Sequence, residues 1–112
     1  MRLTRPAQYR QVFAGKLRSA DRNMTVLATP NGLAHPRLGL AISRKVSPRA
    51  VVRNRIKRQI REVFRQHQAQ LAALDFVVIG RPGLRDLPAD RLRSSLLYHL
   101  NKLSRRSCET SS

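Results

Sequence analysis

The segment from about Pro48 to Gln68 constrains the fold most, because its two sides have opposite chemistry. On a helix, one side carries an apolar stripe made of Val52, Ile56, Ile60, Val63 and Phe64. The other side carries polar residues: Asn54, Arg58, Arg61 and Arg65, with Lys57 beside them and Arg53 and Arg55 at the flanks. We therefore expect a long helix with one buried side, with Ser47 as its N-cap and Pro48 as its first residue.

Positive charge is concentrated in the same region. The chain has 23 basic and 6 acidic residues, a net charge of +17. Nine basic residues and one acid, Glu62, fall between Arg44 and Arg65, so this stretch supplies 9 − 1 = +8 of that charge. Like charges four residues apart destabilise a helix unless an anion binds them. Since 19 of the basic residues are arginines, which bind phosphates bidentately and stack on bases, we expect a nucleic acid partner.

The rest of the chain predicts one α/β domain, a two-layer α+β sandwich over residues 1–105 with a disordered tail at 106–112. Its single sheet has three or four strands and is covered by about three helices. Helices are expected at about 6–14, 48–68 and from near Pro88, and strands at about 23–29, 37–43 and 75–79, with a short extra strand near 19–22.

The strand at 37–43 alternates between large and small side chains. Leu38, Leu40 and Ile42 point one way, and the other side is nearly bare. That bare side leaves room for an extended ligand, or for a helix packed close against the sheet. The spacing of Tyr9 and Phe13 favours core packing for these rings, with base stacking as the alternative.

Catalysis by the protein itself is not expected. His35, His67 and His99 show no metal-ligand spacing and are interpreted as solvated surface residues. The four Asp lie near element ends, where turns and caps explain them, and Cys108 is a bystander thiol. We expect no catalytic residue, no metal ligand and no protein-bound cofactor.

The sequence also indicates where the protein works and with what. No stretch is long and apolar enough for a membrane span or a signal peptide, which predicts a cytoplasmic protein without a membrane partner. No protein partner is evident. An arginine-rich amphipathic helix suits DNA, a membrane surface or RNA. The core of a small domain needs the apolar stripe, which disfavours binding to a membrane surface. A strand, and not a short helix, precedes this helix, which disfavours DNA recognition. RNA is therefore favoured.

Several stretches together resemble the protein subunit of bacterial ribonuclease P. Residues Ala50 to Arg65, with Arg53-Asn54-Arg55, are similar to the "RNR" helix of that family. Supporting matches are Tyr9-x-x-Val12-Phe13, Arg37-Leu38-Gly39-Leu40 leading to Ser43-Arg44-Lys45, and Asp75-Phe76-Val77-Val78-Ile79.

The resemblance implies a ribonucleoprotein endonuclease that removes the 5′ leader from precursor tRNA, with a catalytic RNA subunit that holds the Mg²⁺. It also implies a left-handed βαβ crossover. It assigns RNA-subunit binding to Arg44, Lys45, Arg53, Asn54, Arg55, Lys57, Arg58, Arg61 and Arg65. It assigns the precursor's single-stranded leader to Tyr9, Phe13, Arg37 and Ser43. The alternatives are a small basic ribosomal or other structural RNA-binding protein, and a DNA-binding architectural protein.

Overall fold

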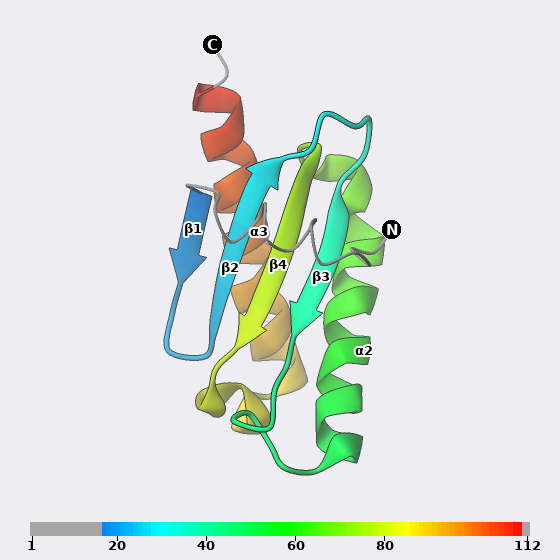
Figure 1. Cartoon of the computed structure of the whole chain (residues 1–112), viewed down its shortest axis with the longest axis vertical. Coiled ribbons are helices and arrows are strands. Elements are labelled where there is room, and N and C mark those ends of the chain that lie inside the picture. Colours follow the sequence, from blue (N-terminus) through cyan, green and yellow to red (C-terminus); the bar gives the residue numbers. More distant parts are fainter. Residues whose placement is uncertain (1–16, 111–112) are drawn as a thin grey trace.

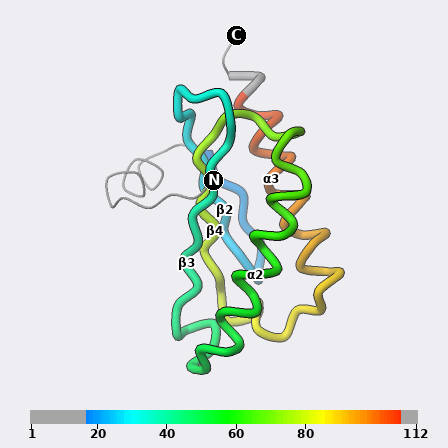
Figure 2. The backbone as a smooth tube through the Cα atoms, turned by 90° about the vertical axis from the view of Figure 1, so that its right-hand side faces the viewer, coloured from blue at the N-terminus to red at the C-terminus, as the bar shows by residue number. Residues whose placement is uncertain are grey.

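Two helices cover one face of a four-stranded sheet (Figures 1 and 2). The computed structural model describes the backbone of residues 17–110 and the side chains of residues 17–107. The helix expected at about 6–14, with Tyr9 and Phe13, lies outside the described residues. The expected α+β sandwich with one sheet is confirmed.

The strands are β1 (Leu17–Ala20), β2 (Met24–Pro30), β3 (Arg37–Ala41) and β4 (Leu74–Gly80), and the helices are α2 (Ala50–His67) and α3 (Ala89–Thr110). Two short 3-10 turns, η1 (Gln68–Gln70) and η2 (Pro82–Asp86), flank β4. The sheet order is β1-β2-β4-β3, antiparallel except for the parallel pair β3 and β4. The short extra strand expected near 19–22 is present as β1, which begins and ends two residues earlier.

The connection from β3 through α2 to β4 has the rare hand. In Figure 1 both strands point down, and β4 lies to the left of β3. Figure 2 shows both helices on the face of the sheet turned away from the viewer of Figure 1. A path that runs down β3, up behind the sheet and down again to the left is a left-handed crossover, against the usual right-handed rule. The hand implied by the resemblance is confirmed.

The core lies between the helices and one face of the sheet. Leu38, Phe76 and Val78 from the strands pack with the apolar side of α2. Phe64 of α2 meets Phe76 edge-on, with ring centroids 6.3 Å apart. From α3 come Leu92, Leu96, Leu100 and Leu103, all at most 1 % exposed. The expected stripe of α2 is therefore a core stripe, which fixes its arginine side toward solvent.

Both helices differ in length from the expectation. The prediction of Ser47 as the N-cap is wrong: α2 begins at Ala50, and Arg49 precedes it in extended conformation. Ser47 Oγ instead accepts the backbone N–H of Arg49 at 3.2 Å, a local turn that competes with capping. At the other end of the chain, α3 continues to Thr110 and so extends into the segment 106–112, for which we expected a tail.

A buried polar network joins β1 to α3. Ser19 Oγ lies 2.6 Å from Nδ1 of His99, and Nε2 of that ring lies 2.9 Å from Asp21 Oδ2. Ser95 Oγ donates to the same carboxylate oxygen at 2.5 Å. The interpretation of His99 as a solvated residue is wrong, since it is 1 % exposed. Ser19 is also only 4 % exposed, and the network, which reaches solvent at Asp21, acts as a structural clamp between β1 and α3.

Candidate nucleic-acid interface

The outward side of α2 gathers most of the predicted RNA-binding residues on one surface. Asn54, Arg55, Arg58, Arg61 and Arg65 are exposed, and Lys57 is half-buried at its border. Arg53 is also half-buried but, at about 100° per residue, lies on the helix side of Ile60 and Phe64. Arg44 and Lys45 are exposed in the loop that leads into the helix. We call the eight residues other than Arg53 the α2 face. The structure thus places eight of the nine residues that the resemblance assigned to the RNA subunit on the outward side of α2 or in the loop before it, whereas Arg53 lies on the apolar side.

The loop before α2 is held in place by its own residues. Val46 is 1 % exposed, and its N–H donates to the carbonyl of Ser43 at 3.0 Å. Gly80 at the end of β4 permits this approach, because a Cβ there would lie 2.8 Å from Val46 Cγ2. Arg53 Nη1 donates to the carbonyl of Ser47 at 2.9 Å. Arg44 and Lys45 are therefore presented from an anchored turn.

Most cations of the α2 face have no acidic partner. Arg65 pairs with Glu62 at 2.5 Å, and this hydrogen-bonded pairing lowers the pKa of Glu62. Within the part of the chain that the structure describes, no ion pair engages Arg55, Arg58 or Arg61. Their guanidinium groups are available to phosphates, which they can bind in bidentate geometry.

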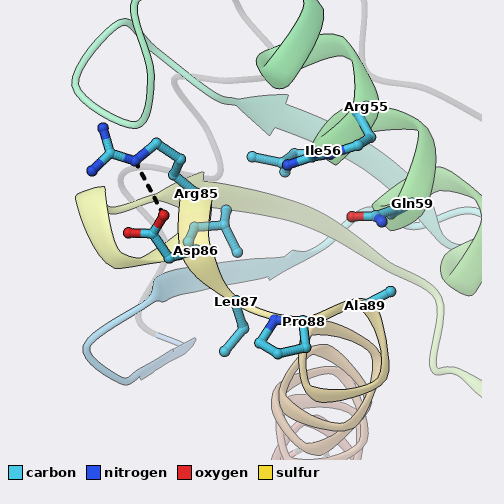
Figure 3. A pocket seen from close by; sticks show the side chains of 9 residues that line it. Arg55, Ile56, Gln59, Arg85, Asp86, Leu87, Pro88 and Ala89 are labelled. Carbon is cyan, nitrogen blue, oxygen red and sulfur yellow. Dashed lines mark ion pairs between the residues drawn. The ribbon is translucent and has the colours of Figure 1, made fainter.

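A polar pocket of about 290 Å³ extends the α2 face toward the start of α3. Arg55 and Gln59 line its α2 side, and residues 84–89 line the other (Figure 3). On that side Arg85 pairs with Asp86 at 3.5 Å. Arg55 therefore borders both the outward face of α2 and this pocket.

The face of the sheet opposite the helices carries one fixed arginine. Arg37 donates from Nε and Nη2 to the two carboxylate oxygens of Asp75, at 2.7 and 2.6 Å. Asn31 Nδ2 adds a hydrogen bond of 3.0 Å to Asp75 Oδ1. The hydrogen bonds to Asp75 raise the pKa of Arg37, so this side chain is a permanent cation. Asp75 is 1 % exposed, and its side chain forms an ion pair inside the sheet. The expectation of a turn or cap role for it is therefore wrong.

The remaining predicted leader-binding residues are only partly placed. In the register of β3 and β4, Gly39 and Ala41 share the face of Arg37 and lie beside Val77 and Ile79. We call this surface, which no described helix covers, the open sheet face; its β3 side chains are small, as the alternation predicted, and the neighbouring Val77 is 0 % exposed. Ser43 is exposed just beyond β3, and its Oγ accepts the N–H of Lys45. Tyr9 and Phe13 lie outside the described residues.

The described residues offer little else for chemistry. Among the side chains described, those of residues 17–107, no group of three His, Cys, Asp or Glu is arranged to hold a metal ion. No helix in that part of the chain has the length and hydropathy to span a membrane. His67 Nδ1 lies 2.9 Å from the carbonyl of Val63, so this ring is engaged by the backbone of α2 itself. The fold and its exposed arginines define a small basic RNA-binding domain.

Comparison with known proteins identifies the family. The family model described as Ribonuclease P matches residues 1–104. The ribonuclease P protein component of Methylococcus capsulatus is 50% identical over 99% of this chain and 87% of its own length. That of Idiomarina loihiensis is 44% identical over 97% of this chain and 87% of its own.

Solved structures of RNase P proteins have the same fold as this chain. The RNase P protein of Staphylococcus aureus superimposes with a TM-score of 0.81 at 34% identity, covering 91% of this chain and 93% of that one. The RNase P protein of Thermotoga maritima superimposes with a TM-score of 0.81 at 29% identity, covering 91% of this chain and 96% of that one. The chain belongs to the ribonuclease P protein family. It is the component of an endoribonuclease that works with an RNA subunit in the 5′ processing of tRNA.

Proposed function

We propose that the protein uses two opposite surfaces: the α2 face docks on the catalytic RNA, and the open sheet face binds the leader of precursor tRNA. The observation that carries the proposal is the separation of the two surfaces by the core. The α2 face points away from the sheet, and Arg37 lies on the sheet's other side.

Docking through the α2 face is electrostatic. Arg58, Arg61 and their neighbours neutralise phosphates and release condensed counterions, so affinity for the RNA falls steeply as salt rises. Their side chains extend from a helix whose other side is locked in the core. The charges therefore reach the RNA as one array with a fixed register.

Leader binding on the open sheet face relies on one oriented cation. Asp75 holds the Arg37 guanidinium through Nε and Nη2, and Nη1 is left to face a phosphate. Small residues at Gly39 and Ala41 let an extended strand approach. By family resemblance Tyr9 and Phe13 provide the rings on which leader bases stack. Ser43, just beyond β3, lies at the end of the proposed path of the leader. Since mature tRNA lacks the leader, this contact favours the precursor.

The reaction depends on Mg²⁺, which the RNA holds. Among the described side chains no group of three His, Cys, Asp or Glu is arranged to hold a metal ion, and Asp75 and Asp21 are engaged by Arg37 and His99. The protein instead lowers the repulsion between phosphates near the cleavage site, which strengthens Mg²⁺ binding by the RNA.

Reconstitution tests this function. The cognate RNA cleaves a precursor tRNA with and without the protein over a range of Mg²⁺ concentrations. We expect the protein to lower the Mg²⁺ concentration for half-maximal cleavage, and the variant Arg22→Ala, exposed and outside both surfaces, to behave like wild type. An unchanged Mg²⁺ requirement contradicts the metal part of the proposal. Absence of any effect on cleavage favours a structural RNA-binding protein.

A further inference from the structure

Helix α3 carries a second basic surface. Arg91, Tyr98, Lys102 and Arg105 are spaced by seven, four and three residues. At about 100° per residue they fall within an arc of about 60°. This set, the α3 stripe, lies opposite the buried residues Leu92, Leu96, Leu100 and Leu103. It therefore faces solvent along about 21 Å of helix, at about 1.5 Å per residue.

The charges of the α3 stripe are not balanced within the protein. Residues 91–107 contain no acid. No ion pair engages Arg91, Lys102 or Arg105 within the described structure. Uncompensated cations on one side of a helix contribute nothing to folding, and they raise the local positive potential. The stripe is complementary to a polyanion.

Tyr98 gives the stripe a feature that charge alone lacks. The other aromatic residues of the described chain, Phe64 and Phe76, are at most 3 % exposed, whereas Tyr98 is 57 % exposed. Lys102 Nζ lies 5.6 Å from the centre of its ring, and the His99 ring meets it edge-on at 5.5 Å. An exposed ring beside a cation is an element that stacks an unpaired base in proteins that bind single-stranded nucleic acid.

The position of the stripe identifies the RNA it can reach. Helices α2 and α3 lie side by side on the same face of the sheet (Figures 1 and 2). Ser95 and His99, which flank the stripe, bond Asp21 next to β1, so the stripe lies on the β1 side of this helical layer. The open sheet face, proposed for the leader, lies on the other side. We propose that the α3 stripe binds a second, unpaired segment of the same RNA subunit that docks on the α2 face. This inference rests on the proposed function of α2.

The charge part is tested with the full chain and the cognate RNA subunit. The triple variant Arg91→Gln, Lys102→Gln, Arg105→Gln is compared with a control that removes the same charge from exposed positions off the stripe: Arg22→Gln, Arg81→Gln, Arg93→Gln. We expect the stripe variant to reduce the slope of log affinity against log salt by about 2, at about 0.7 per lost phosphate contact of a single strand. The control should reduce it much less. Equal slopes for the two variants overturn the proposal.

The stacking part is tested at Tyr98. Tyr98→Leu should weaken RNA binding roughly fivefold or more and remove the chemical protection of an unpaired nucleotide in the RNA, because base stacking is lost. Tyr98→Phe, which keeps the ring, should retain both. If Tyr98→Leu keeps full affinity and protection while Arg58→Ala weakens binding, the α3 stripe is not an RNA surface. If the wild-type chain does not bind the RNA, the proposed function itself fails.

Discussion

The α2 face and the open sheet face both present arginine, but they hold it differently. On α2 the guanidinium groups of Arg58 and Arg61 extend into solvent without an acidic partner in the described chain. On the sheet, Arg37 is 19 % exposed and locked by two hydrogen bonds to a carboxylate that is itself buried. The first arrangement supplies many adaptable charges, and the second supplies one charge of fixed direction.

The difference corresponds to two tasks in recognition. Exposed arginines lose rotamer freedom when they bind, so each adds modest affinity, and the sum is sensitive to salt. A guanidinium already fixed by Asp75 loses little further freedom on binding and can favour one path of a strand over another. We therefore assign affinity to the α2 face and discrimination to the open sheet face.

The largest expected effect concerns the Arg37–Asp75 pair. Arg37→Ala leaves a carboxylate that is 1 % exposed without its cation, which should cost about 3 kcal/mol of folding free energy. The measurement is chemical denaturation of the free protein. The double variant Arg37→Met, Asp75→Leu should recover much of this stability but not the preference for precursor over mature tRNA. A loss below about 1 kcal/mol in the single variant would show that the pair is not fixed as described.

The second prediction concerns the α2 face, where binding changes but stability does not. The double variant Arg58→Ala, Arg61→Ala should alter unfolding free energy by less than about 0.5 kcal/mol, since both side chains are exposed. It should reduce the salt slope of RNA-subunit binding by about 1.5, at about 0.7 to 0.9 per phosphate contact. Filter binding over a salt series measures this, with Arg22→Ala as the control. An unchanged slope would remove α2 from the RNA interface.

Local patterns predicted α2 and the sheet well, because each follows from side chains close in sequence. The stripe from Val52 to Phe64 fixed which side of α2 is buried, and the alternation around Leu38 fixed the face of β3. The partners of Asp75 and His99 were not predictable in this way. Arg37 lies 38 residues before Asp75, and Ser19 lies 80 residues before His99. Only the sheet register and the docking of α3 bring them together.

The polar clamp between β1 and α3 predicts a third, pH-dependent effect. Partial burial raises the pKa of Asp21, but hydrogen bonds from Ser95, His99 and the N–H groups of Asn23 and Met24 outweigh it and lower the value from 3.8 to about 2. Its stabilising contribution is therefore complete above about pH 4 and is lost as the pH falls toward 2. A third of the side chain is exposed, so solvent screening limits the effect to roughly 1 to 2 kcal/mol.

The measurement for this clamp is the unfolding free energy of the wild type and of Asp21→Asn between pH 5 and pH 2. We expect the variant to be less stable at pH 5 and to lose less stability on acidification. Parallel curves for the two proteins would indicate that other carboxylates control acid unfolding. The two RNA surfaces should be unaffected at neutral pH, because the clamp lies in neither.

The smallest expected effect comes from Glu62. Its exposed pair with Arg65 contributes little to stability, so Glu62→Gln should leave the unfolding free energy nearly unchanged. The change frees Arg65 and removes a negative charge from the α2 face, and we expect affinity for the RNA subunit to rise about two- to threefold at low salt. Weaker binding would mean that the Glu62–Arg65 pair itself positions the arginine on the RNA.

The division of labour between the two surfaces is tested most directly by measuring two quantities for two variants. For Arg58→Ala and Phe13→Ala, we would determine the affinity for the RNA subunit and the ratio of holoenzyme affinities for precursor and mature tRNA. We predict that Arg58→Ala lowers the first with little change in the second, and that Phe13→Ala lowers the second with little change in the first. Equal effects of both variants on both quantities would contradict the account.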